Sequence, residues 1–203
     1  MLNKMSKKNI LFVGLAISAL CMTSCSKQPD FDAKSYVQSS LDAEYHEQYA
    51  DYANLMEISE EDVKKQVVED FNESIRQQFA SSDNITEEEI AAYTEKMAEV
   101  KKMAKYKVQD EKKDEDGNYT VSVKVEPSDV FQTLQQSSAE VSKEKIAQGM
   151  KETDPGVFAS VLTESVQKSI DKNSYGDPVT VTVKVEKNHS IFDDIASAKE
   201  KRG

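Results

Sequence analysis

The stretch from residue 120 to residue 126, Thr-Val-Ser-Val-Lys-Val-Glu, decides the fold. Apolar and polar side chains alternate along it, which predicts a β-strand with one buried face. Residues 180–186, Thr-Val-Thr-Val-Lys-Val-Glu, repeat it at an offset of 60, with six of seven residues identical. Two explanations stay open: two half-buried strands have converged on the same residue types, or a helix-helix-strand unit occurs twice.

A second strand is predicted directly before the first. Tyr106-Lys107-Val108-Gln109 also alternates, and residues 114–118, Asp-Glu-Asp-Gly-Asn, separate it from Tyr119. An Asp-Gly pair between two alternating segments predicts a β-hairpin, because glycine readily adopts the positive φ that tight turns require. Pro127 lacks a backbone N–H and should end the second strand.

Helices are predicted around the hairpin, and their starts share one pattern. An apolar residue precedes a capping residue, and a second apolar residue follows the cap by four positions, which is a hydrophobic staple. Glu89 also forms a capping box with Thr86. The pattern occurs at Phe31-Asp32 with Tyr36, Ile58-Ser59 with Val63, Ile85-Thr86 with Ile90, and Val141-Ser142 with Ile146.

Amphipathic stripes extend from these starts. The first helix is expected over about residues 33–55, and from Val63 to Phe79 an apolar residue recurs every fourth position. Two further helices are expected, one capped by Ser128 and one beginning at Asp154-Pro155, where proline suits the first helical position.

Helices on one face of a small antiparallel sheet make an α+β fold. We expect residues 32–126 to form a helical unit ending in the hairpin. Residues 127–203 would form a second helix-strand unit with a loose, charged tail. Whether the two units share one core stays open.

The amino-terminal residues predict export and a lipid anchor. A basic segment, residues 1–9, precedes a 13-residue apolar stretch at 10–22, which is too short to span a membrane and typical of a signal peptide. Met22-Thr23-Ser24-Cys25 resembles the lipobox of bacterial lipoproteins. The resemblance implies removal of residues 1–24 and diacylglyceryl attachment to Cys25. The polar residues that follow predict a short linker, so residues 25–31 would comprise the lipidated cysteine and this linker. Cys21 fits less well because bulky Leu20 precedes it, and an ordinary secretory signal is the alternative.

The charge balance excludes several partners. The chain has 203 residues and a net charge of -11, and its only three bases before Cys25 leave 23 bases against 37 acids in the remainder. Such a surface repels nucleic acid and anionic lipid headgroups. Membrane attachment on the extracytoplasmic face would therefore depend on the lipid.

No motif predicts catalysis, a metal or a cofactor. His46 and His189, the only histidines, lack metal-ligand spacing and are predicted to be surface residues. An acylated Cys25 cannot be a catalytic thiol. Residues 114–116 resemble a calcium loop only superficially, because the required oxygen ligands fall on Lys112 and Val123.

Tyr45, Tyr49 and Tyr52 lie on one side of the first predicted helix. Aromatic residues at helical spacing are usually core residues. The alternative interpretation is a strip that lines a ligand cleft.

Three stretches extend a family resemblance across most of the chain. Residues 36–43, 105–108 and 116–121 are similar to uncharacterised surface lipoproteins of Gram-positive, Firmicute-type bacteria, which carry a domain of unknown function. The resemblance implies a cell-membrane location and an α+β domain, but no activity. We therefore expect a non-enzymatic module that binds an unknown protein or small molecule, or an extracytoplasmic chaperone or assembly factor. A carboxylate-dependent hydrolase is a third hypothesis.

Overall fold

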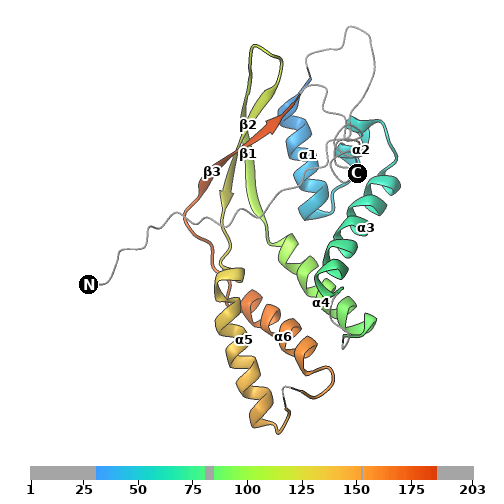
Figure 1. Cartoon of the computed structure of the whole chain (residues 1–203). Coiled ribbons are helices and arrows are strands. Elements are labelled where there is room, and N and C mark those ends of the chain that lie inside the picture. Colours follow the sequence, from blue (N-terminus) through green and yellow to red (C-terminus); the bar gives the residue numbers. More distant parts are fainter. Residues whose placement is uncertain (1–30, 81–84, 152, 187–203) are drawn as a thin grey trace, which may run out of the picture. The chain divides into compact units, whose positions relative to one another are not determined.

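The computed structural model describes residues 31–80, 85–151 and 153–186 (Figure 1). Residues 26–187 belong to one compact unit. Several predictions fall outside the described residues: the signal peptide, the acylation of Cys25, the linker up to residue 30, the position of His189 and the charged tail. No helix within the described ranges is long and apolar enough to cross a membrane.

The predicted α+β fold is confirmed. In the described part of the chain, six helices accompany a three-stranded antiparallel sheet. The elements are α1 (Ala33–His46), α2 (Ala50–Met56), α3 (Glu60–Phe79), α4 (Glu87–Lys102), β1 (Lys105–Lys113), β2 (Tyr119–Glu126), α5 (Val130–Ala147), α6 (Val157–Asp171) and β3 (Val179–Val185).

The sheet has the order β1-β2-β3, and the predicted hairpin joins its first two strands. The Asp114 N–H donates to the Asn118 carbonyl at 2.8 Å, and Gly117 has a φ of 87°. A register shift between Val108 and Glu111 makes a bulge in β1. The two copies of the repeated heptapeptide lie side by side in antiparallel strands, with Ser122 opposite Thr182.

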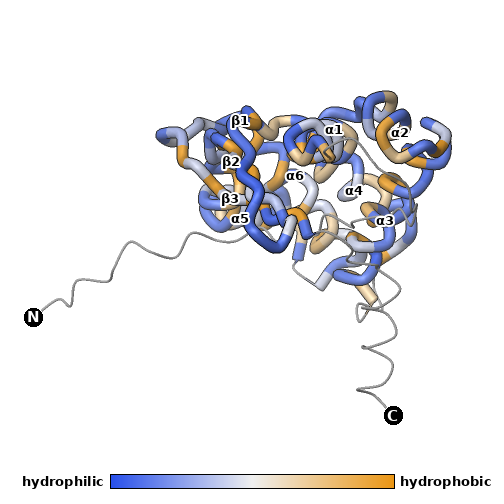
Figure 2. The backbone as a smooth tube through the Cα atoms, turned by 90° about the horizontal axis from the view of Figure 1, so that it is seen from above, coloured by the Kyte–Doolittle hydropathy of each residue, from blue (hydrophilic) through white to orange (hydrophobic). Residues whose placement is uncertain are grey.

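The core lies between the sheet and α1. Val37 and Leu41 of α1 are buried with Val121 and Val123 of β2. Because valines at alternate positions share one face of a strand, β2 presents all of them to α1. Seen from two directions, α1 lies between the sheet and α2 (Figure 1, Figure 2).

Three of the four helix starts that the staple pattern predicted are confirmed. The carboxylate of Asp32 accepts from the Ser35 N–H at 2.8 Å, and the Ser59 hydroxyl accepts from the Asp62 N–H at 3.0 Å. Thr86 opens α4 with the complete capping box. These contacts satisfy N–H groups that have no partner within their helix.

The fourth predicted start, at Ser142, is wrong because α5 continues through it from Val130 to Ala147. No glycine or proline interrupts these residues, and Val141 lies on the buried face. α5 ends at Ala147, and Gly149 shortly beyond it has a φ of 88°. The staple pattern at Ser142 therefore belongs to a helix interior.

Two predicted boundaries also need correction. The helix expected over residues 33–55 is broken into α1 and α2, because Glu47 adopts a φ of 58° and its N–H donates to the Asp42 carbonyl. The last predicted helix begins at Val157 rather than Pro155. The Asp154 carboxylate accepts from the Lys151 N–H at 2.8 Å, which closes a turn before α6.

Candidate functional site

A polar cluster joins α1 to the start of β1. Gln38, Asp42 and His46 are spaced by four residues, so their side chains share one edge of α1. The Gln38 amide donates to both carboxylate oxygens of Asp42 at 2.9 and 2.8 Å. The Tyr106 hydroxyl donates to Asp42 Oδ1 at 2.7 Å. We call these four residues the α1–β1 polar cluster.

His46 occupies the carboxyl end of this cluster. Its Nε2 lies 3.0 Å from the Ala104 carbonyl oxygen, and its Nδ1 lies 3.1 Å from the Tyr106 hydroxyl. The rings of His46 and Tyr106 stack at 5.0 Å with an interplanar angle of 13°. His46 keeps 32% of its side chain exposed, which fits the predicted surface position, but both ring nitrogens face groups of the same chain.

Tyr45 packs against the same tyrosine, with ring centroids 6.1 Å apart. Burial, aided by the nearby charge of Glu44, raises the pKa of Tyr45 to about 12. Burial also raises the pKa of Tyr106, and the hydrogen bond to the Asp42 carboxylate adds to this effect. Both phenols stay protonated at neutral pH, so neither provides a phenolate nucleophile there.

Tyr49 and Tyr52 are 6% and 8% exposed and belong to the hydrophobic core. Tyr52 lies against Tyr36, with ring centroids 6.0 Å apart. The break between α1 and α2 at Glu47 separates the tyrosines. Tyr45 precedes the break, and Tyr49 and Tyr52 follow it. Tyr45 therefore belongs to α1, Tyr49 is the N-cap of α2 and Tyr52 lies within α2, so the three side chains do not form one strip.

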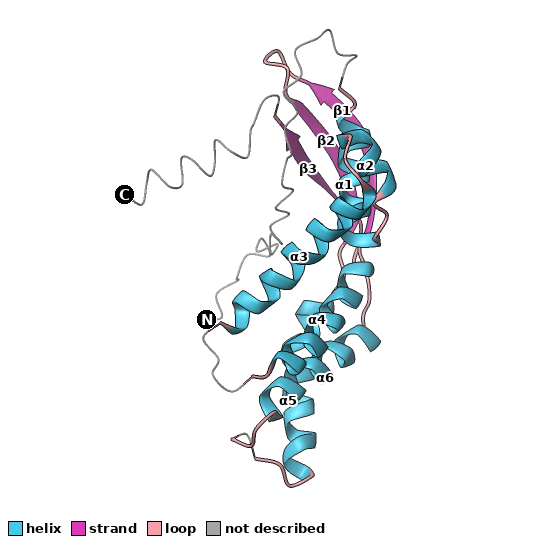
Figure 3. Cartoon of the chain, turned by 90° about the vertical axis from the view of Figure 1, so that its right-hand side faces the viewer, coloured by secondary structure: helices cyan, strands magenta, loops and turns pink. Residues whose placement is uncertain are grey.

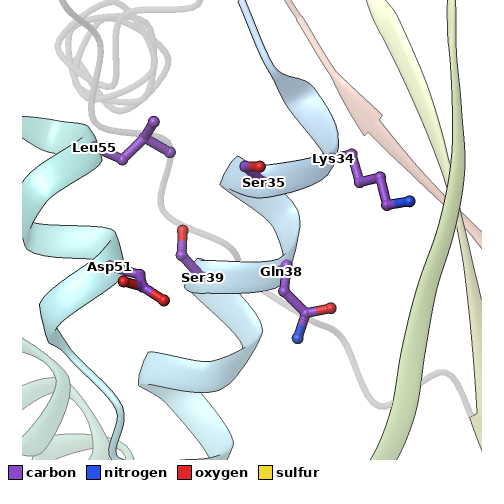
Figure 4. Close-up of a pocket in the computed structure, with 6 residues that line it drawn as sticks. All are labelled: Lys34, Ser35, Gln38, Ser39, Asp51 and Leu55. Carbon is purple, nitrogen blue, oxygen red and sulfur yellow. The ribbon is translucent and has the colours of Figure 1, made fainter.

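A shallow depression of about 250 Å³ lies between α1 and α2, below the ~300 Å³ of a typical small-molecule cleft. Figure 4 shows Asp51 and Leu55 pointing toward α1, whereas Lys34 points away. None of the three tyrosines lines it. Its lining residues are Lys34, Ser35, Gln38, Ser39, Asp51 and Leu55.

Several polar groups of this depression already have partners. The Ser35 hydroxyl donates to Asp32 at 2.6 Å, and the Ser39 hydroxyl donates to the Tyr36 carbonyl at 3.2 Å. Gln38 donates to Asp42 in the α1–β1 polar cluster. A ligand would have to compete with these contacts, which weakens a small-molecule interpretation of this depression.

A second depression, of about 210 Å³, lies between α4 and α6 and contains Glu89 and Glu164. Hydrogen bonds from the Thr86 backbone and hydroxyl lower the pKa of Glu89. Burial opposes ionisation of Glu164, but hydrogen bonds from Lys145 and Ser160 outweigh it and lower its pKa. Neither carboxyl group has the raised pKa that a hydrolase acid needs.

Asp114, which the sequence analysis considered as part of a calcium loop, also has a local role in the hairpin turn. Asp114 accepts from the Asn118 N–H at 2.8 Å, a hydrogen bond that lowers the pKa of its carboxyl group. Within residues 31–80, 85–151 and 153–186, no group of three His, Cys, Asp or Glu side chains is placed to hold a metal ion.

Sequence reasoning missed the α1–β1 polar cluster. The four-residue spacing of Gln38, Asp42 and His46 was a usable signal for a shared helix edge. Their partner Tyr106, however, lies 60 residues beyond His46, and only the packing of α1 on β1 brings it close.

Comparisons of the chain with protein-family models, curated proteins and solved structures yield no match.

Proposed function

We propose that this chain is a lipid-anchored extracytoplasmic lipoprotein whose folded part is a non-enzymatic interaction module. The observation that carries the anchor is Met22-Thr23-Ser24-Cys25 at the end of an apolar stretch of signal-peptide length. Asp32, the N-cap of α1, follows Cys25 by seven residues. The short polar segment between them suits a linker from the lipid to the domain.

The lipid would supply the membrane affinity. Two acyl chains hold a protein stably at a bilayer, where a single chain gives marginal binding. The acidic remainder of the chain, with 37 acids against 23 bases after Cys25, would add no attraction to anionic headgroups.

Polar side chains with partners inside the fold, together with exposed apolar side chains, support an interaction module. The α1–β1 polar cluster is satisfied within the fold, and the two depressions are shallow. By contrast, apolar side chains stand exposed next to each other on β3, where Val179 and Val181 share one face and are 39% and 42% exposed. Exposed apolar surface favours contact with another macromolecule over enclosure of a small ligand.

Radiolabelled palmitate tests the anchor in a bacterial host that acylates lipoproteins. We expect label in the wild-type chain and in Cys21→Ser, which is the matched control. Cys25→Ser should take up no label and move to the soluble fraction. Equal membrane retention of Cys25→Ser, or absence of label from the wild-type chain while other lipoproteins are labelled, would contradict the proposal.

An extracytoplasmic chaperone is the second candidate, favoured by the tip of the α5–α6 hairpin. Ile146, Met150 and Phe158 are 53%, 39% and 57% exposed around the turn that joins the two helices. Such a tip would contact apolar segments of unfolded clients. Suppression of client aggregation at near-equimolar ratio, reduced in Ile146→Ser/Phe158→Ser, is expected. Inertness of the wild-type chain removes this candidate.

A further inference from the structure

β3 is an end strand of the sheet. In the part of the chain that the structure describes, it pairs with β2 and with no other strand (Figure 3). Its second edge thus presents backbone N–H and C=O groups to any chain that adds a further strand.

The apolar face of β3 is poorly covered. Val123 of β2 is 2% exposed, whereas its direct neighbour Val181 in β3 is 42% exposed. Val179 is 39% exposed opposite Val125. Residues directly opposite each other in a ladder share one face of the sheet, so these valines continue the face that α1 covers over β2.

The β2–β3 pairing shows which sequence suits this edge. Ser122 faces Thr182, and these are equivalent positions of the repeated heptapeptide. The pairing is therefore centred on a local two-fold axis, with Val121 opposite Val183 and Val123 opposite Val181. β3 already pairs antiparallel with a near-copy of its own sequence.

We propose that the free edge of β3 pairs antiparallel with β3 of a second copy of this chain, with Thr182 opposite Thr182 of that copy. This register repeats the residue pairs of the β2–β3 ladder. Val181 faces Val183, and Lys184 faces Thr180, so no like charges lie directly opposite each other. The two sheets become one continuous sheet whose apolar faces lie on the same side.

The proposal deepens the proposed function by naming the partner of the interaction module, but it does not depend on the anchor. Dimerisation can be measured in solution whether or not Cys25 carries lipid. The paired segment is only seven residues long, so we expect a weak dimer, with a dissociation constant on the order of micromolar. Tethering to one membrane would raise its population.

Charge placed at residue 182 tests this register. The full chain is purified in a mild detergent that keeps the apolar residues 10–22 dispersed, and its mass is followed by sedimentation velocity against concentration. The wild-type chain should dimerise. Thr182→Lys and Thr182→Glu should each weaken the dimer by about two- to fivefold, because like charges then face each other.

An equimolar mixture of Thr182→Lys and Thr182→Glu should dimerise again, since opposite charges now meet. Thr182→Gln adds length without charge and should retain the dimer. Circular dichroism confirms that each variant keeps its fold. A wild-type chain that stays monomeric at about 100 µM, well above the micromolar range expected here, overturns the proposal. So does a dimer that neither charged variant weakens, or one that forms only after residues 188–203 are removed.

Discussion

Hydrogen bonds between polar side chains, as well as apolar contacts, join neighbouring elements of this fold. The α1–β1 polar cluster is one case. A second lies between α5 and α6, where the Ser169 hydroxyl donates to the Ser137 hydroxyl at 2.9 Å and both side chains are fully buried. A buried hydroxyl without a partner costs more than a made hydrogen bond contributes.

The serine pair gives a prediction about coupling. Ser137→Ala leaves the Ser169 hydroxyl without its acceptor and should lower the free energy of unfolding by about 1 kcal/mol. The double variant Ser137→Ala/Ser169→Ala removes both hydroxyls and should cost less than the two single variants added together. Urea unfolding of the four chains measures this. Strict additivity would argue against the pair, and exposed Ser74→Ala serves as the control.

A pH prediction follows from Tyr45. Its pKa of about 12 in the folded chain exceeds the ordinary value of 10.0. The protonated phenol is favoured by folding, so this contribution is complete below pH 10 and is lost as the pH rises through 12. Tyr45→Phe cannot ionise, and its free energy of unfolding should fall less between these pH values. An unchanged slope in alkaline urea titrations would contradict the assignment.

For single residues, the sequence showed their spacing along the chain but not their contacts in the fold. The spacing of Tyr45, Tyr49 and Tyr52 was visible, but the break after His46 that separates them was not. The hydrogen-bond partners of His46 were not predicted, because Ala104 and Tyr106 are distant from it in the chain. Contacts of this kind depend on tertiary packing, which no local pattern encodes.

Among the elements, the helix starts with a side-chain cap at Asp32, Ser59 and Thr86 were predictable, whereas the break after His46 was not. A cap at Ser59 or Thr86 forms from adjacent residues, so its chemistry is local. α1 and α2 end instead at Glu47 and Glu57, which adopt φ values of 58° and 55° without the glycine that usually marks such an end. Because the sequence held no signal there, one long helix was expected.

Glu57 offers a prediction for these ends. A side chain in the left-handed region costs roughly 1–2 kcal/mol. Glycine avoids that cost but gains entropy in the unfolded chain, so Glu57→Gly should raise the free energy of unfolding by about 0.5 kcal/mol. Glu57→Val should lower it by about 1 kcal/mol, because a branched side chain fits this conformation worst. Thermal or urea unfolding with the reverse order would contradict the cap.

For the whole molecule, the decisive feature is the pairing of the two repeated heptapeptides. The alternation of apolar and polar residues predicted a strand at each heptapeptide. The hairpin before the first of them indicated an antiparallel sheet. The sequence could not say that residues 120–126 and 180–186 are neighbours, since the α5–α6 hairpin separates them. That neighbourhood fits either origin of the repeat, convergence or duplication.

The proposed lipid anchor and the proposed β3 dimer are also connected at the level of the whole molecule. An anchored domain meets other copies of itself at a raised local concentration, so even a weak β3 edge contact would be populated. A soluble, unanchored chain would need a stronger interface for the same effect. Membrane tethering and the exposed edge of β3 are therefore predicted to favour the dimer together.

The mass of the amino-terminal peptide, isolated from the chain expressed in a bacterial host that acylates lipoproteins, tests the proposed anchor most directly. We predict a peptide that begins at Cys25 and carries a diacylglyceryl group on the sulfur. Cys25→Ser should yield no such peptide. An unmodified Cys25 in a chain whose first residue lies elsewhere would contradict the account.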